Sequence, residues 1–172
     1  LKTAGYATGI FGKWHLGDGE AYLPGNRGFD EALIHGAGGV GQVTLGDFPA
    51  NGENRYFDNV LLHNETIMQT QGFCTDLFFQ AGLAWIKQQH EVQKPYFAYI
   101  SLNAPHGPMI APERYTHRFL DLGYDEGIAG RYGMIENIDD NFGLLMEKLT
   151  EWKALENTLV IFMTDNGATH LG

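Results

Sequence analysis

Residues 96–106 read YFAYISLNAPH, and this stretch decides the fold. Its first seven residues, 96–102, are mostly aromatic or aliphatic, which is typical of a buried β-strand. The polar and proline-containing residues 103–106 then favour a loop. The stretch therefore predicts a buried strand that carries His106 just beyond its carboxyl end.

Amphipathic patterns flank this strand on both sides. Before it, apolar residues at steps of three and four predict a helix over residues 75–89, and after it the same spacing predicts a helix over residues 134–152. A second apolar run predicts a strand over residues 158–163. The alternation of helix and strand indicates an α/β domain with a mostly parallel sheet flanked by helices.

The composition fits one compact domain. Of 172 residues, 44% are hydrophobic and 19% are charged, which provides a core and is too little charge for a disordered chain. The net charge of -10 argues against binding to nucleic acid or to anionic membranes. The single cysteine excludes an intrachain disulfide, and the lack of a run of about eighteen apolar residues predicts no membrane span.

Both predicted strands end in residues that can bind ligands, and in open α/β sheets ligands gather beyond the carboxyl ends of the strands. His106 follows the first strand between prolines that restrict its direction. Asp165 and Asn166 follow the second and offer oxygen ligands suited to Ca²⁺ or Mg²⁺. A structural histidine and an Asp-Asn-Gly turn are the alternatives that the pattern leaves open.

Residues 12–17, GKWHLG, place a lysine and a histidine two positions apart. In an extended segment Lys13 and His15 point to the same side, whereas Trp14 turns into the core. Such a pair can bind one anionic group. A solvated lysine beside a structural histidine is an equally good interpretation of this spacing alone.

Five other residues are interpreted as non-catalytic. Cys74, at a helix start, is expected to be a packed thiol. Asp139 and Asp140 are expected on a solvated face, because neighbouring helical positions diverge by about 100°. His35 and His170 are expected at the periphery of a pocket.

In their order along the chain, the motifs resemble those of a type I sulfatase of the arylsulfatase group, and the resemblance covers essentially the whole chain. The motifs are GKWHLG at 12–17, NRGFD at 26–30, APHGP at 104–108 and TDNG at 164–167. The ordered set favours a functional role for five residues. These are Lys13, His15, His106, Asp165 and Asn166.

The resemblance implies an alkaline-phosphatase-like α/β sandwich that cleaves sulfate monoesters of small molecules or carbohydrates to an alcohol or phenol plus sulfate. It implies a formylglycine nucleophile made from Cys or Ser, whose motif is absent from these residues. We therefore expect that nucleophile upstream of Leu1, and expect residues 1–172 to be part of a single catalytic domain. Exported relatives make a periplasmic or secreted location the expectation.

The same resemblance assigns roles to the site residues. Lys13 would contact the sulfate and the nucleophile, and His106 would bind the sulfate and help protonate the departing alcohol. His15 would contact the formylglycine hydroxyl and act as the base that releases sulfate. Asp165 and Asn166 would help hold a divalent cation, Ca²⁺ in first place and Mg²⁺ as the alternative.

Two other functions remain compatible with the sequence. A phosphodiesterase or phosphonate monoester hydrolase of the alkaline phosphatase superfamily would share the sheet and the metal position, but Asn166 and the GKWHLG string favour a sulfatase. A catalytically inactive module derived from a sulfatase is the second alternative. The isolated chain is expected to have no turnover, because it lacks the nucleophile motif.

Overall fold

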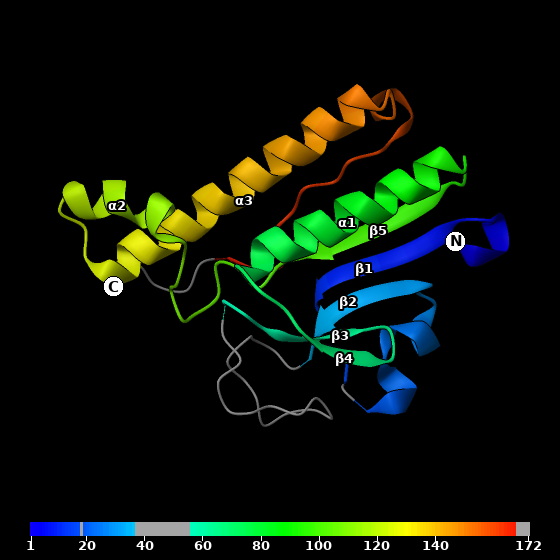
Figure 1. Cartoon of the computed structure of the whole chain (residues 1–172), viewed down its shortest axis with the longest axis horizontal. Helices are drawn as coiled ribbons and strands as arrows, with labels where there is room; N and C mark the ends of the chain where they lie inside the picture. The colour runs from blue at the N-terminus through cyan, green and yellow to red at the C-terminus, as the bar shows by residue number, and fades with distance from the viewer. Residues whose placement is uncertain (18, 37–55, 168–172) are drawn as a thin grey trace.

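A computed structural model describes residues 1–17, 19–36 and 56–167, so His170 lies outside the described residues. The chain forms a five-stranded sheet with the order β4-β3-β2-β1-β5 (Figure 1). The strands are β1 (Ala7–Lys13), β2 (Glu31–His35), β3 (Val60–His63), β4 (Thr66–Gln69) and β5 (Tyr96–Ser101). Strand β1 pairs in parallel with both β2 and β5, whereas β3 and β4 add an antiparallel hairpin beside β2. The predicted α/β class and the strand over 96–102 are confirmed.

The helices are α1 (Cys74–Glu91), α2 (Glu113–Asp121) and α3 (Glu126–Glu151), with short 3-10 helices at Lys2–Ala4, Glu20–Tyr22, Pro24–Arg27 and Leu155–Asn157. Helices α1 and α3 lie on the same side of the sheet (Figure 1). Helix α1 packs on β1 and β5 with its buried apolar side, which confirms the helix predicted over 75–89. In the described part of the chain, no helix is both long enough and apolar enough to cross a membrane.

Helix α3 begins about two turns earlier than its apolar spacing predicts. The carboxylate of Asp125 caps its first turn by accepting a hydrogen bond from the Ile128 N–H at 3.0 Å. Glycines weaken the helical pattern in these turns. Tertiary packing requires one of them, because a Cβ on Gly130 would lie 2.1 Å from the carbonyl oxygen of Met109.

The opposite face of the sheet carries a second, smaller core. Ile10 and Trp14 of the β1 region and Ile34 of β2 are buried there, with Leu23 and Phe29 packed against them. Both faces of the central strands are therefore covered, which leaves the strand ends as the polar margin of the sheet.

The strand predicted over 158–163 is wrong for the described residues. This segment forms no strand and no ladder with any described strand, although it follows α3 as expected. Its apolar side chains are largely outside the core, with Leu159 86% exposed and Met163 77% exposed. An extended backbone needs a hydrogen-bonded neighbour to become a strand, and apolar sequence alone does not supply one.

Candidate functional site

Lys13 is the last residue of β1 and is held from both sides. The Ser101 hydroxyl donates to its carbonyl oxygen at 2.7 Å, and the next N–H along the chain, that of Trp14, donates to the carbonyl of His35 at 3.2 Å. Gly12 allows the first contact, because a Cβ there would lie 1.7 Å from the Ser101 carbonyl oxygen. The half-buried Lys13 is therefore set at the carboxyl edge by both neighbouring strands.

Trp14 turns into the core, as its position between Lys13 and His15 predicts. Its side chain is 4% exposed, and its indole N–H lies 3.0 Å from the carbonyl of Gly17 and 3.1 Å from that of Tyr22. These contacts fix the turn that follows β1. His15 stays exposed beside this anchored ring.

His106 lies in the loop after β5, at the same edge of the sheet as Lys13, because β1 and β5 are parallel neighbours. Its Nδ1 is 2.8 Å from the Gly107 carbonyl, which calls for a proton on Nδ1 and leaves Nε2 for other partners. The buried Tyr56 hydroxyl donates to the His106 carbonyl at 2.5 Å. Burial raises the pKa of Tyr56, so that it remains a donor at neutral pH.

Helix α3 packs closely against the His106 loop. Met109 and Ala111 of this loop lie against Gly130 and Gly133, where added Cβ atoms would come within 2.1 Å and 3.1 Å of them, respectively. Only a helix surface without side chains allows so close an approach. The position of the loop therefore depends on its close packing against α3.

Asp165 and Asn166 follow the extended segment that begins at Thr158. The Thr158 hydroxyl lies 3.3 Å from that of Tyr96 at the start of β5, and the ring of Phe162 lies 5.0 Å from Phe142 as the chain returns along α3 (Figure 1). The segment thus starts beside the start of β5 and leads toward the carboxyl edge of the sheet.

The TDNG motif itself forms an exposed turn. The Asn166 N–H donates to Oδ1 of Asp165 at 2.8 Å, so the turn that the sequence left open as an alternative is present. Among residues 1–17, 19–36 and 56–167, no three His, Cys, Asp or Glu side chains come together in a group that could hold a metal ion. The oxygen donors that the motif offers to a cation are the side chains of Asp165 and Asn166.

The residues interpreted as non-catalytic divide into two groups. Cys74 is fully buried, and burial raises its pKa to about 12, while Asp139 and Asp140 are exposed on α3. His35 has only 1% exposure and lies directly beside Lys13 in the β1–β2 register, a position at the end of a strand that the sequence did not predict.

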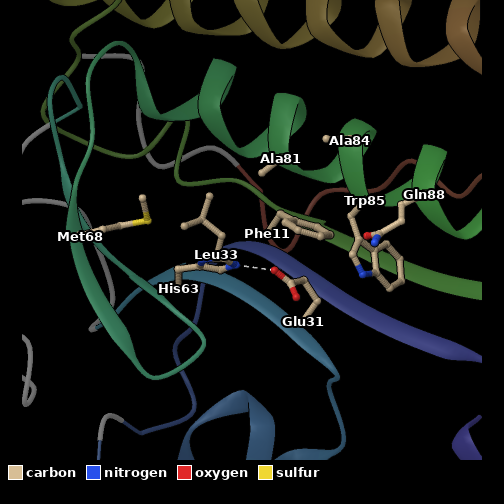
Figure 2. Close-up of a pocket in the computed structure, with 9 residues that line it drawn as sticks. All are labelled: Phe11, Glu31, Leu33, His63, Met68, Ala81, Ala84, Trp85 and Gln88. Atoms are coloured by element: carbon tan, nitrogen blue, oxygen red, sulfur yellow. Dashed lines mark hydrogen bonds and ion pairs between the residues drawn. The ribbon is translucent and has the colours of Figure 1, made fainter.

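A separate pocket of about 360 Å³ opens between α1 and the strands β2 to β4 (Figure 2). Phe11, Leu33 and Trp85 form its apolar wall, and the ion pair of His63 with Glu31 at 2.5 Å lies at its edge. Glu31 begins β2, so the pocket reaches toward the amino ends of the strands. None of the five predicted site residues lines it.

Comparison with known proteins agrees with the motifs. The profile of the family described as Sulfatase matches residues 1–172, the whole chain. The chain belongs to the sulfatase family. The N-acetylgalactosamine-6-sulfatase of Canis lupus familiaris is 31% identical over 98% of this chain, and the arylsulfatase of Klebsiella aerogenes is 27% identical over the same share. These matches cover 32% and 46% of the relatives, so this sulfatase chain spans about a third to a half of their length.

Solved structures place the fold in the same family. The crystal structure of Ps i-CgsB in complex with k-i-k-neocarrahexaose matches with a TM-score of 0.75 and 27% identity, over 91% of this chain and 36% of that chain. The PsFucS1 sulfatase from Pseudoalteromonas sp. matches with a TM-score of 0.63 at 21% identity, over 91% of this chain and 34% of that chain, which supports the fold alone. The alkaline-phosphatase-like α/β architecture implied by the resemblance is confirmed for this part of a sulfatase.

Proposed function

We propose that the protein is a sulfuric ester hydrolase that cleaves sulfate monoesters of carbohydrates or other small molecules to an alcohol or phenol plus sulfate. The observation that carries this proposal is the pairing of β1 and β5 as parallel neighbours, which brings Lys13 and His106 to one edge of the sheet in a chain that matches the sulfatase family throughout. Carbohydrate sulfates are proposed as the substrate class, since relatives are named for N-acetylgalactosamine 6-sulfate and crystallised with a neocarrahexaose.

In this proposal Lys13 binds the sulfate group and counters the charge that develops on its oxygens as the ester bond breaks. Hydrogen bonds at the Lys13 carbonyl and at the Trp14 N–H hold the backbone here, so that the side chain alone has to reach the sulfate. A cation held at a half-buried strand end acts more strongly than one in bulk water, because the local dielectric constant is lower.

In its imidazolium form, His106 binds the sulfate on the side of the leaving oxygen and gives that oxygen its Nε2 proton, while the proton on Nδ1 stays in place. Its Nδ1 is occupied by the Gly107 carbonyl at 2.8 Å, so Nε2 is the atom that binds and transfers. His15, two residues after Lys13 and exposed, is the proposed base for the release of sulfate from the nucleophile. The formylglycine nucleophile is proposed to come from outside residues 1–172 and to supply the covalent chemistry.

Asp165 and Asn166 fit a hard divalent cation by the chemistry of their donors, which are oxygens, and Ca²⁺ is favoured over Mg²⁺. Both side chains are exposed, and the Asn166 N–H engages Oδ1 of Asp165, so Oδ2 is the carboxylate oxygen we expect at the cation. When bound, the cation would supply positive charge beside the sulfate. Two oxygens are too few for Ca²⁺, so its other ligands are expected from outside these residues.

Activity of the full-length protein tests the proposal. The purified enzyme, produced with its formylglycine modification, is assayed with 4-nitrophenyl sulfate and 4-nitrophenyl phosphate, and sulfate release from sulfated oligosaccharides is measured by ion chromatography. We expect sulfate esters to be preferred. Preference for the phosphate ester would instead favour the phosphohydrolase alternative, and no turnover of any ester would favour the inactive module.

Variants assign the activity to the proposed residues. Lys13→Ala and His106→Ala are each expected to lower kcat/KM for 4-nitrophenyl sulfate by about a hundredfold or more, the usual effect of losing one electrostatic or acid-base group. Lys87→Ala and His117→Ala are the matched controls, because both side chains are exposed in surface ion pairs on α1 and α2. Lys13→Ala activity within about twofold of wild type would contradict the assignment.

Cation binding is tested separately from turnover. Titration calorimetry with Ca²⁺ on the metal-stripped full-length protein is expected to show binding that Asp165→Ala weakens by at least about tenfold, since a carboxylate ligand is lost. Asp139→Ala, which removes an exposed carboxylate on α3, is the control and should bind as wild type does. Equal affinities for Asp165→Ala and wild type would exclude Asp165 as a ligand.

A further inference from the structure

A buried hydrogen-bonded pair joins the ends of β2 and β5 behind the proposed site. We propose that His35 and Asn103 are positioning residues, which fix the His106 loop relative to Lys13. The inference rests on the proposed function in one respect, which is that Lys13 and His106 must act on the same ester for their relative position to affect kcat. Neither member of the pair touches the proposed substrate position, since His35 is 1% and Asn103 is 4% exposed.

The side chains bridge two strands that are not neighbours. Strand β1 lies between β2 and β5 in the sheet, and His35 at the end of β2 still reaches Asn103 after β5, with its Nε2 in contact with the Asn103 amide. The contact therefore passes across the end of β1, where Lys13 pairs with His35 in the strand register. Neighbouring strands lie about 4.8 Å apart, so a contact between β2 and β5 has to cross two such spacings.

The backbone of each partner holds a segment that carries a proposed site residue. The His35 carbonyl accepts from the Trp14 N–H at 3.2 Å, between Lys13 and His15. The Asn103 carbonyl accepts from the His106 N–H at 2.8 Å. The chain of contacts therefore runs from the Lys13 turn through His35 and Asn103 to His106 without interruption.

The hydrogen-bond roles within the pair follow from the carbonyl on its other side. Nδ1 of His35 is 2.7 Å from the Gly36 carbonyl, so Nδ1 carries a proton and the neutral ring offers a lone pair at Nε2. Nδ2 of Asn103 is buried without a hydrogen-bond partner, whereas Oδ1 faces His35. With the neutral ring, a half-turn of the amide directs its NH₂ to Nε2; with the imidazolium, Nε2 donates to Oδ1 in the observed orientation, and either way the pair is hydrogen-bonded.

Such a pair is suited to positioning because its loss leaves a buried polar group without a partner, and the loop must move to bring water to it. The histidine ring is also confined by packing, with its centroid 6.3 Å from that of Phe78 in α1. A small displacement of a catalytic group can lower turnover by about a hundredfold. The expected signature is therefore a loss in kcat with a KM close to that of wild type.

The test uses the full-length protein and two independent measurements. Hydrogen–deuterium exchange with mass spectrometry reports on the His106 N–H through peptides that cover residues 103–112, and kinetics with 4-nitrophenyl sulfate report kcat and KM. The variants are Asn103→Leu, which keeps the branched shape and removes the hydrogen bonds, His35→Phe, which keeps a ring, and the double variant.

We expect each single variant to speed exchange in residues 103–112 by at least about tenfold, to lower kcat by about 10- to 100-fold and to leave KM within about threefold. The double variant should lose no more than the worse single variant, because both break the same contact. His35→Gln, which keeps a polar group toward Asn103, should recover most of the kcat that His35→Phe loses. If His35→Phe does not fold, Asn103→Leu alone carries the test.

Asn137→Leu is the matched control. Asn137 is also a fully buried asparagine, and its Nδ2 donates to Asp76 at 2.6 Å between α1 and α3. This variant should lower the unfolding temperature without changing exchange in residues 103–112 or kcat of the folded protein. A purely structural role for the pair predicts the same result for Asn103→Leu, and that result would overturn the proposal.

Failure of the proposed function is distinguishable from failure of this inference. If the wild-type enzyme cleaves no sulfate ester, the proposed function fails and the exchange measurement alone decides whether the pair fixes the His106 loop. If the enzyme is active and Asn103→Leu exchanges and turns over as wild type does, the inference fails and the proposed function stands. Additive losses of kcat in the double variant would also overturn the inference, because they would show two independent effects.

Discussion

The carboxyl ends of β1 and β5 and the segment 158–167 carry the two halves of the proposed site, and they are held in different ways. The strand ends are joined by backbone and side-chain hydrogen bonds, such as that from Ser101 to Lys13 at 2.7 Å. The segment has extended backbone, exposed apolar side chains and no ladder in the described residues. Residues 96–101 and 158–163 have similar apolar sequences, but only residues 96–101 form a strand, because only they have a strand partner in the described residues.

This difference separates the part of the proposed site that strand pairing holds in place from the part that it does not. The relatives are two to three times longer than their matched parts, and a strand partner for residues 158–163 is expected from such additional sequence. The anion-binding half of the proposed site is built within the described residues. For the metal-binding half, the described residues offer Asp165 and Asn166, and its other ligands are proposed to come from outside them.

Among the variants that disturb the paired strands β1 and β5, Gly12→Ala is expected to have the largest effect. The added Cβ would lie 1.7 Å from the Ser101 carbonyl oxygen, and the φ of +131° at Gly12 disfavours any L side chain. We expect the free energy of unfolding, measured with urea, to fall by about 3 kcal/mol or more. Gly28→Ala, with a φ of +101° and open space, isolates the backbone effect and should cost about 1 kcal/mol. Equal losses in the two variants would show that the approach of β1 to β5 is not tight.

A matched pair of truncations compares the two regions directly. Ile100 of β5 packs into the main core, whereas Ile161 in the extended segment is 71% exposed. Ile100→Ala is expected to lower the unfolding free energy of this chain by about 2 kcal/mol, and Ile161→Ala by less than about 0.5 kcal/mol. The same urea titration measures both. A large loss for Ile161→Ala would show that the segment is packed in solution.

The sequence predicted the ordered region well for physical reasons that are local. The apolar run from Tyr96 to Ser101, the helical spacing before it and the inward turn of Trp14 each follow from a few neighbouring residues. The start of α3 was missed, since glycines such as Gly130 are poor helix formers and are there to receive a loop. That requirement comes from a contact distant in sequence.

The same reasoning explains the limits of the site prediction. The sequence placed His106 after the strand over 96–102 and Lys13 in an extended segment, and the strands β5 and β1 at these positions are neighbours. The burial of His35 and its contact with Asn103 depend on a sheet order that the sequence did not determine. The prediction of a strand over 158–163 was wrong because an apolar run indicates only the capacity to pair, and pairing needs a second strand.

Gly130→Ala tests the support of the His106 loop by α3. The Cβ would lie 2.1 Å from the Met109 carbonyl oxygen, so the loop or the helix must shift, while the better helix propensity of alanine offsets part of the cost. We expect a net loss of about 1.5 kcal/mol in unfolding free energy. Gly143→Ala, in the same helix with open space at its Cβ, should instead gain up to about 1 kcal/mol. A gain in both variants would contradict the close packing of the loop.

The smallest effect on the free energy of unfolding is expected from the ion pair of Lys2 with Asp30. The hydrogen bond from Lys2, at 2.6 Å, and those from Thr8 lower the pKa of Asp30, although both partners of the ion pair are exposed by 40% or more. A carboxyl whose pKa is lower in the folded state stabilises the protein above its unfolded pKa of about 3.9, and this contribution is lost as the pH falls through the folded pKa.

Because solvent screens this pair, Asp30→Asn should cost no more than about 0.5 kcal/mol at pH 7, and this loss should shrink as the pH falls through the folded pKa of Asp30. Lys2→Met should show the same loss at pH 7, and the double variant should add little to it, because one interaction is removed in each case. Urea titrations at pH 7 and pH 2 measure the difference. A loss above about 2 kcal/mol would mean that charge, rather than the fit of β1 between its neighbours, holds this region in place.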